Sequence, residues 1–325
     1  MKKHIGKLIV LASLCSLTAV AFAQDNAGYP ARPIRLIVPS PAGGEPDTLA
    51  RLVAQQMSAD LRQPVVVENK PGAGGLVGIA ALANAKPDGY TIGVSYQAAL
   101  ALSPHLLVKK LFDPLTDIAP VGLVSVSGNA LMVPAKSPIS SFGDLVKHAQ
   151  ANPGKMNFGS WGDGSAGHIS GEIMKRSAGI EMQHVAYKGS SEALMAMLAG
   201  DMDATFGGWA LASAQAKAGA VRVLAVTSPE RAAAFPEAPT FQELGIPFGL
   251  NSWYGIIAPA GVPPSIIQRL ERSVKMAVAQ PPVAAGLTSM GMLPQSSTAA
   301  QLGDRIRNDY QIWGKAITDV GIQPR

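Results

Sequence analysis

Two glycine-rich turns have the residue types and the spacing of an anion-binding site. The segments Leu36–Asp47 and Met156–His168 each combine a short apolar run, a turn rich in glycine and the start of a helix. Glycine lets the backbone approach a ligand closely, and the first N–H groups of a helix carry partial positive charge without a partner inside the helix. If the two turns lie in different lobes and face each other, they form a clamp for a small anion.

A third glycine-rich turn, Pro71–Gly78, follows the apolar run Val65–Val67 as a nucleotide-binding loop would. The fingerprint G-x-G-x-x-G, counted from Gly72, requires glycine where the chain has Val77, and no G-K-[ST] follows. The turn can still offer backbone N–H groups to an anion. The sequence predicts neither a nucleotide nor any other cofactor.

Catalytic and metal-binding patterns are incomplete. The pattern G-x-S-x-G fails by one glycine at Ser160 and again at Ser165. Ser165 and His168 share a helix face at i, i+3, either as a nucleophile with its base or as a helix cap followed by a packed imidazole. The histidines beyond the first 23 residues form no H-E-x-x-H motif, and no acidic cluster has EF-hand spacing. No metal site is predicted.

Composition restricts the class of protein. The 325 residues are 47% hydrophobic and only 15% charged, which suits a large buried core and not a disordered chain. Three of the 27 basic residues, Lys2, Lys3 and Lys7, fall in the first seven positions, and the rest of the chain is nearly neutral against 22 acidic residues. We expect no nucleic-acid partner, because such a partner requires a clustered basic surface.

The amino terminus resembles a secretory signal. Its lysines precede the apolar run Leu8–Phe22, and Ala21-Phe22-Ala23 offers small residues where a signal peptidase cleaves. A membrane anchor would need about 20 apolar residues, and a lipoprotein would need a small residue before Cys15, where the chain has Leu14. We therefore expect residues 1–23 to be removed after Ala23 and the mature protein, which then lacks cysteine, to be periplasmic.

Apolar runs alternate with helical patterns from Ile34 onward, which is typical of an α/β fold. The expected strands are Ile34–Val38, Val65–Val67, Tyr90–Val94, Ala130–Val133, Met182–Tyr187 and Val221–Val226. The expected helices are Thr48–Leu61, Gly75–Ala85, one capped by Ser141 and ending near Gln150, Glu192–Ala199 capped by Ser190 or Ser191, one from Ser265 to about Ala279, and one from Thr298 to about Val320.

Several stretches together resemble one protein family. The chain from about Tyr29 to Gly321 is similar to the Bug family of extracytoplasmic solute receptors, the substrate-binding proteins of tripartite tricarboxylate transporters. The stretches that carry the resemblance are Pro41–Asp47, Val67–Gly75, Pro87–Tyr90, Gly162–His168, His184–Gly189, Leu224–Ser228 and Ala258–Gly261. Each is weak alone, and their order behind a signal peptide makes the match specific.

The resemblance implies a type II periplasmic binding protein with two α/β lobes, two crossover strands and a ligand cleft between the lobes. The first lobe would comprise residues 24–127 and 228–325, and the second lobe residues 128–227. Crossovers would lie near Ser125–Ala130 and between Val226 and Tyr254. The resemblance also implies a monomeric receptor, without catalytic activity, that delivers a small organic acid to the membrane permease subunits of a tripartite tricarboxylate-type transporter.

The family's binding mode implies that backbone groups and waters hold a ligand carboxylate. On this sequence the first lobe would contribute Ser40–Asp47 and Pro71–Gly75, and the second lobe Gly162–His168, Tyr187–Gly189 and a Phe206–Trp209 turn. The predicted ligand-binding residues are Ser40, Ala42, Gly43, Gly44, Glu45, Asp47, Gly74, Gly75, Tyr96, Gln97, Trp161, Gly162, Ser165, Ala166, His168, Tyr187, Lys188, Gly207 and Gly208.

Several of these positions depart from the family pattern. Ser40 can donate its hydroxyl to the ligand or serve as a turn serine. Glu45 can point to solvent or meet a cationic or hydroxyl group on the ligand. Trp161 can stack on a ring of the ligand or cover its apolar body, or it can serve only in packing within the protein. The turn at Gly207-Gly208 lacks the polar group common in relatives, and Tyr96-Gln97 replaces smaller residues.

The predicted loops are therefore rich in aromatic groups and poor in basic ones. We expect an organic acid with an apolar or aromatic body in preference to citrate. Two other functions remain open from the sequence: a sensor that presents its ligand to a membrane kinase, and an exported serine hydrolase that uses Ser165 and His168.

Overall fold

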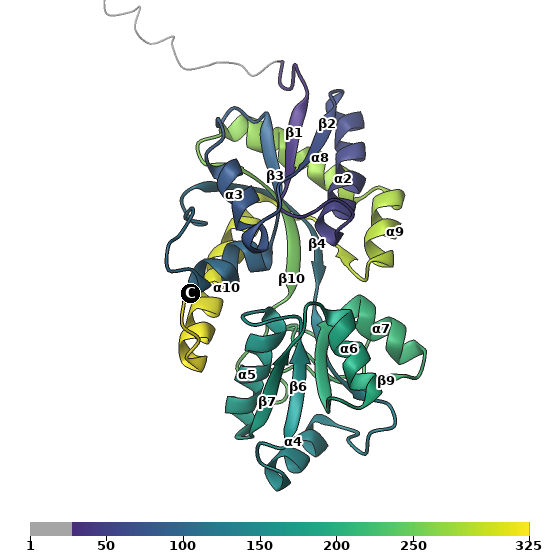
Figure 1. The fold of residues 1–325 in the computed structure, drawn as a ribbon. Helices are drawn as coiled ribbons and strands as arrows, with labels where there is room; N and C mark the ends of the chain where they lie inside the picture. The colour runs from purple at the N-terminus through teal and green to yellow at the C-terminus, as the bar shows by residue number, and fades with distance from the viewer. Residues whose placement is uncertain (1–27, 325) are drawn as a thin grey trace, which may run out of the picture.

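The computed structural model describes residues 28–324, so the predicted signal peptide, residues 1–23, lies outside the described residues. The described chain forms two α/β lobes, one above the other in Figure 1, each built on its own sheet. The first sheet has the order β11–β4–β10–β3–β1–β2, and the second has the order β7–β6–β8–β5–β9. This arrangement confirms the predicted type II periplasmic binding protein fold.

The first sheet is mixed. Its strands are β1 (Ile34–Val38), β2 (Val65–Asn69), β3 (Thr91–Tyr96), β4 (Ile118–Ser127), β10 (Ser252–Pro259) and β11 (Leu293–Pro294). Strand β1 runs parallel to β2 and β3, whereas β10 runs antiparallel to both β3 and β4. Helices cover both faces because successive side chains of a strand point to opposite sides. Leu36 and Val38 therefore enter one core, and Ile37 enters another.

Each face of the first sheet has its own helices. One face packs against α2 (Glu45–Leu61), α8 (Pro264–Val278) and α9 (Pro281–Ser289). The other packs against α3 (Leu76–Ala83), the short helix η2 (Ala98–Leu102) and the first half of α10 (Ala299–Val320). Two further short helices, η1 (Ala73–Gly75) and η3 (Ser103–Leu106), adjoin α3 and η2.

The second sheet is organised in the same way. Its strands are β5 (Asn129–Pro134), β6 (Met156–Ser160), β7 (Met182–Ala186), β8 (Ala204–Gly208) and β9 (Val221–Val226). Leu131 and Val133 face a core with α4 (Phe142–Ala151) and α5 (Ala166–Ala178), whereas Ala130 and Met132 face a core with α6 (Ser190–Ala199) and α7 (Trp209–Lys217).

The chain passes between the lobes twice, where the sequence predicts crossovers. Strand β4 of the first sheet ends at Ser127, and β5 of the second sheet begins at Asn129. The return runs from β9 to β10, which re-enters the first sheet at Ser252. Before that point Phe241, Ile246 and Phe248 are buried in the core of the second sheet. Residues 228–250 thus pack with the second lobe and not with the first, where the predicted range 228–325 placed them.

Helix α10 belongs to both lobes. Its Leu302 and Ile306 enter a core of the first sheet, and its Trp313 and Ile317 enter a core of the second. Figure 1 shows this helix, coloured yellow, running along the side of the junction between the lobes. It is therefore a third connection, made by packing and not by a crossover strand.

Two predicted helix starts are confirmed. The Ser141 hydroxyl accepts the Asp144 N–H at the start of α4, and Thr298 begins α10, where it forms a capping box with Gln301.

A third helix starts earlier than predicted. Helix α2 begins at Glu45 and not at Thr48, because Pro46 fits the first turn, where its missing N–H is no loss.

Other local predictions were wrong. Gly189, without a side-chain bond, caps α6 in place of Ser190 or Ser191. Helix α8 begins at Pro264, one residue before Ser265. The predicted Phe206–Trp209 turn is the end of β8 and the start of α7, since β8 pairs with β5 as far as Gly208.

Candidate ligand-binding cleft

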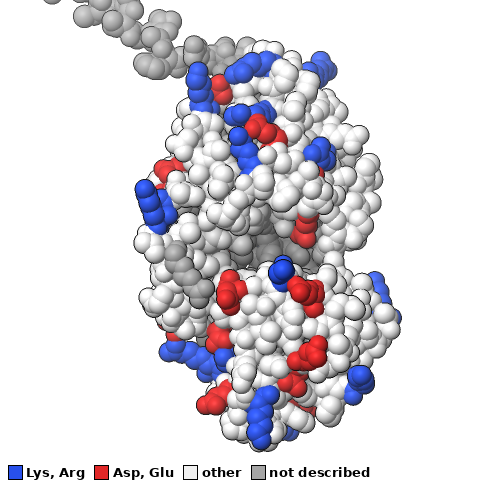
Figure 2. Space-filling model, in the orientation of Figure 1, with Lys and Arg blue, Asp and Glu red and all other residues white. Residues whose placement is uncertain are grey.

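A cleft of about 550 Å³ separates the two lobes. Figure 2 shows that the molecular surface is hollowed between them. The first lobe contributes side chains from the start of α2, the end of β3, η2 and η3, and β10. The second lobe contributes the loop after β6 and the starts of α6 and α7. Both walls and the crossover therefore line one space, as a clamp requires. Its lining residues are Glu45, Gly74, Tyr96, Gln97, Ala98, Leu102, Ser103, Leu106, Ser127, Asn129, Trp161, Asp163, Gly164, Ser165, Ala166, Ser190, Gly208, Trp209, Ala210, Ser252, Trp253, Tyr254 and Met290.

The loop that precedes α2 is shaped by the buried carboxylate of Asp47. This carboxylate accepts the Gly43 N–H at 2.9 Å, the Asn69 side-chain amide at 2.9 Å and the Arg51 Nε–H at 3.0 Å. The hydrogen bond from Arg51, supported by those from Gly43 and Asn69, lowers the pKa of Asp47 to about 2. Asp47 is thus ionised at neutral pH and lies beneath the loop, where it holds the backbone.

Two tyrosines form part of the same wall. The Tyr254 hydroxyl donates to Glu45 Oε1 at 2.7 Å, and the Tyr96 hydroxyl donates to the Gly74 carbonyl at 2.7 Å. Their rings lie 5.8 Å apart. Burial raises the pKa of Tyr96 to about 12, and burial together with the Glu45 charge raises the pKa of Tyr254 well above 10. Both phenols therefore remain hydrogen-bond donors at neutral pH.

The opposite wall is the loop between β6 and α5. Ser165 caps α5, because its Oγ accepts the His168 N–H at 3.3 Å. The same hydroxyl donates to Ser160 Oγ at 3.2 Å, and Ser160 Oγ lies 2.7 Å from His184 Nε2. The Gly164 N–H donates to His168 Nδ1 at 3.0 Å. Hydrogen bonds thus fix this loop from behind and leave Ser165 facing the cleft.

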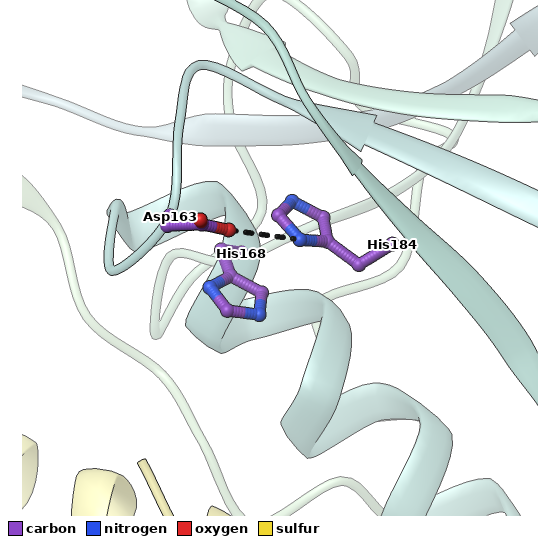
Figure 3. Close-up of side chains that lie close together, drawn as sticks. All are labelled: Asp163, His168 and His184. Atoms are coloured by element: carbon purple, nitrogen blue, oxygen red, sulfur yellow. Dashed lines mark ion pairs between the residues drawn. The ribbon is translucent and has the colours of Figure 1, made fainter. Parts of the chain in front are cut away.

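The two histidines behind the loop are stacked, as Figure 3 shows with Asp163. The rings of His168 and His184 lie 3.9 Å apart at an angle of 9°, and His184 Nδ1 is 3.6 Å from Asp163 Oδ1. Burial first, and then the neighbouring His168, lowers the pKa of His184 to about 4. His184 is therefore neutral at neutral pH, so its Nε2 can accept the Ser160 proton while Nδ1–H faces Asp163.

Asp163, His168 and His184 each offer a ligand atom within 4.8 Å of the others, which is the spacing of a possible metal site. The ring nitrogens of stacked imidazoles direct their lone pairs within parallel planes, so one ring would have to turn before both could bind one ion. Ser160, His184 and Asp163 also have the order of a catalytic triad. Ser160, however, is fully buried. The group acts as a support for the loop.

The structure brings eight of the predicted site residues to the cleft: Glu45, Gly74, Tyr96, Gln97, Trp161, Ser165, Ala166 and Gly208. The other eleven predicted residues do not line it: Ser40, Ala42, Gly43, Gly44, Asp47, Gly75, Gly162, His168, Tyr187, Lys188 and Gly207.

The reason differs from one of these residues to another. Ser40 is buried and donates to the Pro41 carbonyl. His168 supports the loop through Gly164, as described above. Lys188 is exposed, and its backbone N–H donates to Glu192. Gly207 lies within β8, paired with Ala130.

Sequence reasoning missed several lining residues. Trp253 and Tyr254 are on β10, which was not predicted as a strand, and Ser127 and Asn129 flank the first crossover at Gly128. The adjacent aromatic pair within the predicted return crossover was the one available signal. The positions of Ser103 and Met290 follow only from the three-dimensional arrangement.

A two-lobed α/β fold with a solute-sized cleft at its two crossovers defines the class of periplasmic solute-binding proteins. Within that class, residues 49–322 match the tripartite tricarboxylate transporter family receptor, TctC. The chain belongs to this family, and the resemblance to the Bug proteins is confirmed.

Individual relatives agree with this assignment. The chain is 32% identical to the protein BugT of Bordetella pertussis, over 98% of each chain. It is similar to the solved structure of Rhodopseudomonas palustris MatC with bound malate, with 28% identity, a TM-score of 0.72 and coverage of 89% of this chain and 100% of that chain. It is also similar to R. palustris Rpa4515 with adipate, with 30% identity, a TM-score of 0.76 and coverage of 91% and 100%.

The family consists of periplasmic substrate-binding receptors and not of enzymes. Among residues 28–324, no helix is both long and apolar enough to cross a membrane.

Proposed function

We propose that this protein captures a small organic acid with an apolar or aromatic body by closure of its two lobes, and delivers it to the permease of a tripartite tricarboxylate-type transporter. The observation that carries the proposal is the lining of the cleft, which combines aromatic side chains with neutral hydrogen-bond donors. Two similar proteins have structures with carboxylates, adipate and malate, whose size suits a cleft of about 550 Å³.

Neutral donors are sufficient to hold a carboxylate. The Ser190 hydroxyl and the first backbone N–H groups of α5, which begins at Ala166, lie on the second wall, and Asn129 lies at the crossover between the lobes. A hydrogen bond to a charged group contributes about 1.5 to 3 kcal/mol, and micromolar binding requires about 8 kcal/mol net of ordering costs. Four to six such donors from both walls meet this requirement without an arginine.

The aromatic lining favours an apolar ligand body. Trp161 and Trp209 lie on the second wall, and Tyr96 and Tyr254 lie on the first. A flat or apolar body placed between these rings gains dispersion contacts and loses contact with water when the lobes close. A tricarboxylate would instead bring three charges to a cleft without basic side chains among its lining residues.

The proposed export and oligomeric state are those predicted from the sequence, as are most of the proposed ligand contacts. Export would depend on residues 1–23, with cleavage after Ala23, and the mature chain would act as a monomer in the periplasm. The ligand would contact those predicted residues that line the cleft, together with Asn129, Trp209 and Tyr254.

A thermal-shift screen followed by calorimetry tests the proposed ligand class. We expect aromatic and long-chain carboxylates to raise the melting temperature and citrate to have little effect. Replacement Trp161→Ala should weaken binding of the best carboxylate at least ten-fold. If tricarboxylates stabilise the protein and aromatic carboxylates do not, the proposed ligand class is wrong.

A receptor should also release its ligand unchanged. We expect chromatography to recover the bound acid intact after prolonged incubation, and Ser165→Ala to change affinity only. Conversion of the ligand by the wild-type protein and loss of that conversion in Ser165→Ala would indicate a hydrolase.

A further inference from the structure

The charged residues that line the cleft are acidic on both walls. Glu45 lies on the first wall and Asp163 on the second, and neither lysine nor arginine occurs among the lining residues that the structure describes. The basic residues of the neighbouring loops are placed elsewhere. Arg51 binds Asp47 and Asn69, and Lys188 is exposed outside the lining. A ligand therefore meets negative charge from the protein.

Glu45 is held in place but keeps accepting capacity. Its Oε1 takes the Tyr254 hydroxyl proton at 2.7 Å, which fixes the carboxylate at the mouth of the first wall. Within residues 28–324, no ion pair joins Glu45 to a lysine, arginine or histidine. A carboxylate has about four lone-pair positions on its two oxygens, so Oε2 can accept further donors.

Asp163 differs in this respect. Its Oδ1 lies 3.6 Å from His184 Nδ1, and its side chain is 59% exposed. Both acidic side chains are exposed, and neither has a positively charged partner in the part of the chain that the structure describes, since His184 is neutral. Of the two, Glu45 lies on the wall opposite the second-lobe donors, so it is the acidic group that can meet the far end of a ligand whose carboxylate those donors hold.

We propose that the ligand carries a protonated amine in addition to its carboxylate, and that Glu45 selects such amino carboxylates over dicarboxylates. This inference rests on the proposed function as a carboxylate receptor. The ammonium group would donate to Glu45 Oε2, while the carboxylate at the other end would bind the neutral donors of the second wall. Closure would then bury an ammonium–carboxylate pair at Glu45, while the ligand carboxylate is held by uncharged donors.

A carboxylate or a methyl group at the far end of the ligand would bind less favourably beside Glu45. A second carboxylate would meet a like charge at close range as the lobes close and exclude water. A methyl group would leave Oε2 without a donor once water is displaced. A hydroxyl would satisfy the hydrogen bond at Oε2 but leave the charge of Glu45 unbalanced, so an ammonium group is the end group that meets both requirements.

Probes that share one body and differ only at one end test this selection. The aliphatic set is 6-aminohexanoate, hexanoate, 6-hydroxyhexanoate and adipate, and the aromatic set is 4-(aminomethyl)benzoate, 4-methylbenzoate and terephthalate. Calorimetry of the mature chain at pH 7 should show the amine of a set binding at least ten-fold tighter than its dicarboxylate and its methyl counterpart.

Variants at Glu45 connect the selection to this residue. Glu45→Gln keeps the acceptor for Tyr254 but removes the charge, so the preference for the amine should disappear and dicarboxylate affinity should rise at least ten-fold. Glu45→Ser also removes the charge but introduces no amide that could itself bind a carboxylate, and it should give the same reversal of preference. The control Glu237→Gln removes an exposed charge outside the cleft and should leave the wild-type ratio unchanged.

Different results contradict different parts of the argument. If adipate or terephthalate binds the wild type as tightly as the amines, or the hydroxyl probe equals the amine, the inference is wrong and the carboxylate receptor stands. A preference for amines that persists in Glu45→Gln also rejects it. Binding of hexylamine without binding of any carboxylate would reject the proposed function, and the inference with it.

Discussion

Asp47 organises the loop before α2 through three donors from three places in the sequence. Gly43 and Arg51 are close in the chain, whereas Asn69 comes from the end of β2. The motif led us to expect a ligand contact, and the structure instead gives a buried anion that holds the wall. Asp47 could be singled out from the sequence because it belongs to the glycine-rich motif. Its partner Asn69 could be identified only from the structure, in which β1 pairs with β2.

Replacement Asp47→Asn should destabilise the protein, because an amide cannot accept from all three donors. The pKa of Asp47 falls from 3.8 to about 2 on folding, so its charge contributes roughly 2 kcal/mol to the free energy of unfolding. Because the folded pKa is depressed, this contribution is present above about pH 4 and is lost as pH falls toward 2. Urea unfolding of wild type and variant at several pH values measures it.

The exposed Asp304 provides a control for this measurement. It pairs with Arg307 on the surface of α10, and Asp304→Asn should change the free energy of unfolding by less than about 1 kcal/mol. An Asp47→Asn variant as stable as wild type at pH 7 would contradict the assigned role.

At the scale of elements, a buried hydrogen bond joins α10 to β10. The Trp253 indole N–H donates to Asp309 Oδ2 at 2.7 Å, and both residues are buried. Trp253 also lines the cleft. The hydrogen bond therefore connects the ligand-binding wall of β10 to the helix that packs on both lobes.

Asp309→Asn should change the dependence of stability on pH. Burial raises the pKa of Asp309 to about 6, despite opposing effects of Trp253, Arg305 and Asn308. The folded state therefore holds a proton that the unfolded state releases near pH 4, and its stability falls as pH rises from about 4 to about 6. The loss amounts to at most about 3 kcal/mol.

The variant carries no such charge, so its free energy of unfolding should rise relative to wild type across that interval. Chemical denaturation of both proteins at pH 4 and pH 7 gives the difference directly. A difference that stays constant between these pH values would show that Asp309 does not titrate as described.

Elements with strong local signals were predictable. Thr298 indicated the start of α10, and the helical pattern of α2 was recognisable. Strand β10 was missed because no turn signal marks its boundaries in the sequence. Its strand conformation is set by pairing with β3 on one side and β4 on the other. Likewise, the end of β8 was interpreted as part of a Phe206–Trp209 turn because Gly207 and Gly208 are typical of turns, yet pairing with β5 extends β8 through both.

At the scale of the whole molecule, tryptophans report on the cleft. Trp161 and Trp209 line it from the second lobe, and Trp253 lines it from the first. Trp313, the fourth tryptophan of the sequence, is buried where α10 packs against Phe248. Trp209 and Trp253 are already buried, whereas Trp161 is only partly buried, so ligand capture with closure should remove water chiefly from the Trp161 indole.

We expect the carboxylate with the largest thermal shift to change intrinsic fluorescence, with an emission maximum displaced to shorter wavelength and saturation at the calorimetric stoichiometry. Trp313→Phe should retain the change, whereas Trp161→Phe should reduce it. A carboxylate that binds tightly in calorimetry without altering emission in the wild type would argue against closure around it.

The general position of the cleft was predictable, because the resemblance implied a cleft between two lobes and each glycine-rich turn was assigned to a different lobe. The identity of its lining was less so, because whether a loop residue faces the ligand or the core depends on contacts distant in sequence. Glu45 illustrates this: the sequence left it open between solvent and ligand, and Tyr254, 209 residues away, directs it to the mouth of the cleft.

Helix α10 has a consequence for how tightly any ligand can be held. Rotation of the second lobe has to carry Trp313 along or separate it from Phe248, so the resting angle between the lobes depends on packing that no ligand touches. Apparent affinity scales with the fraction of molecules already able to close. Substitutions along this helix can thus tune uptake up or down while selectivity stays the same.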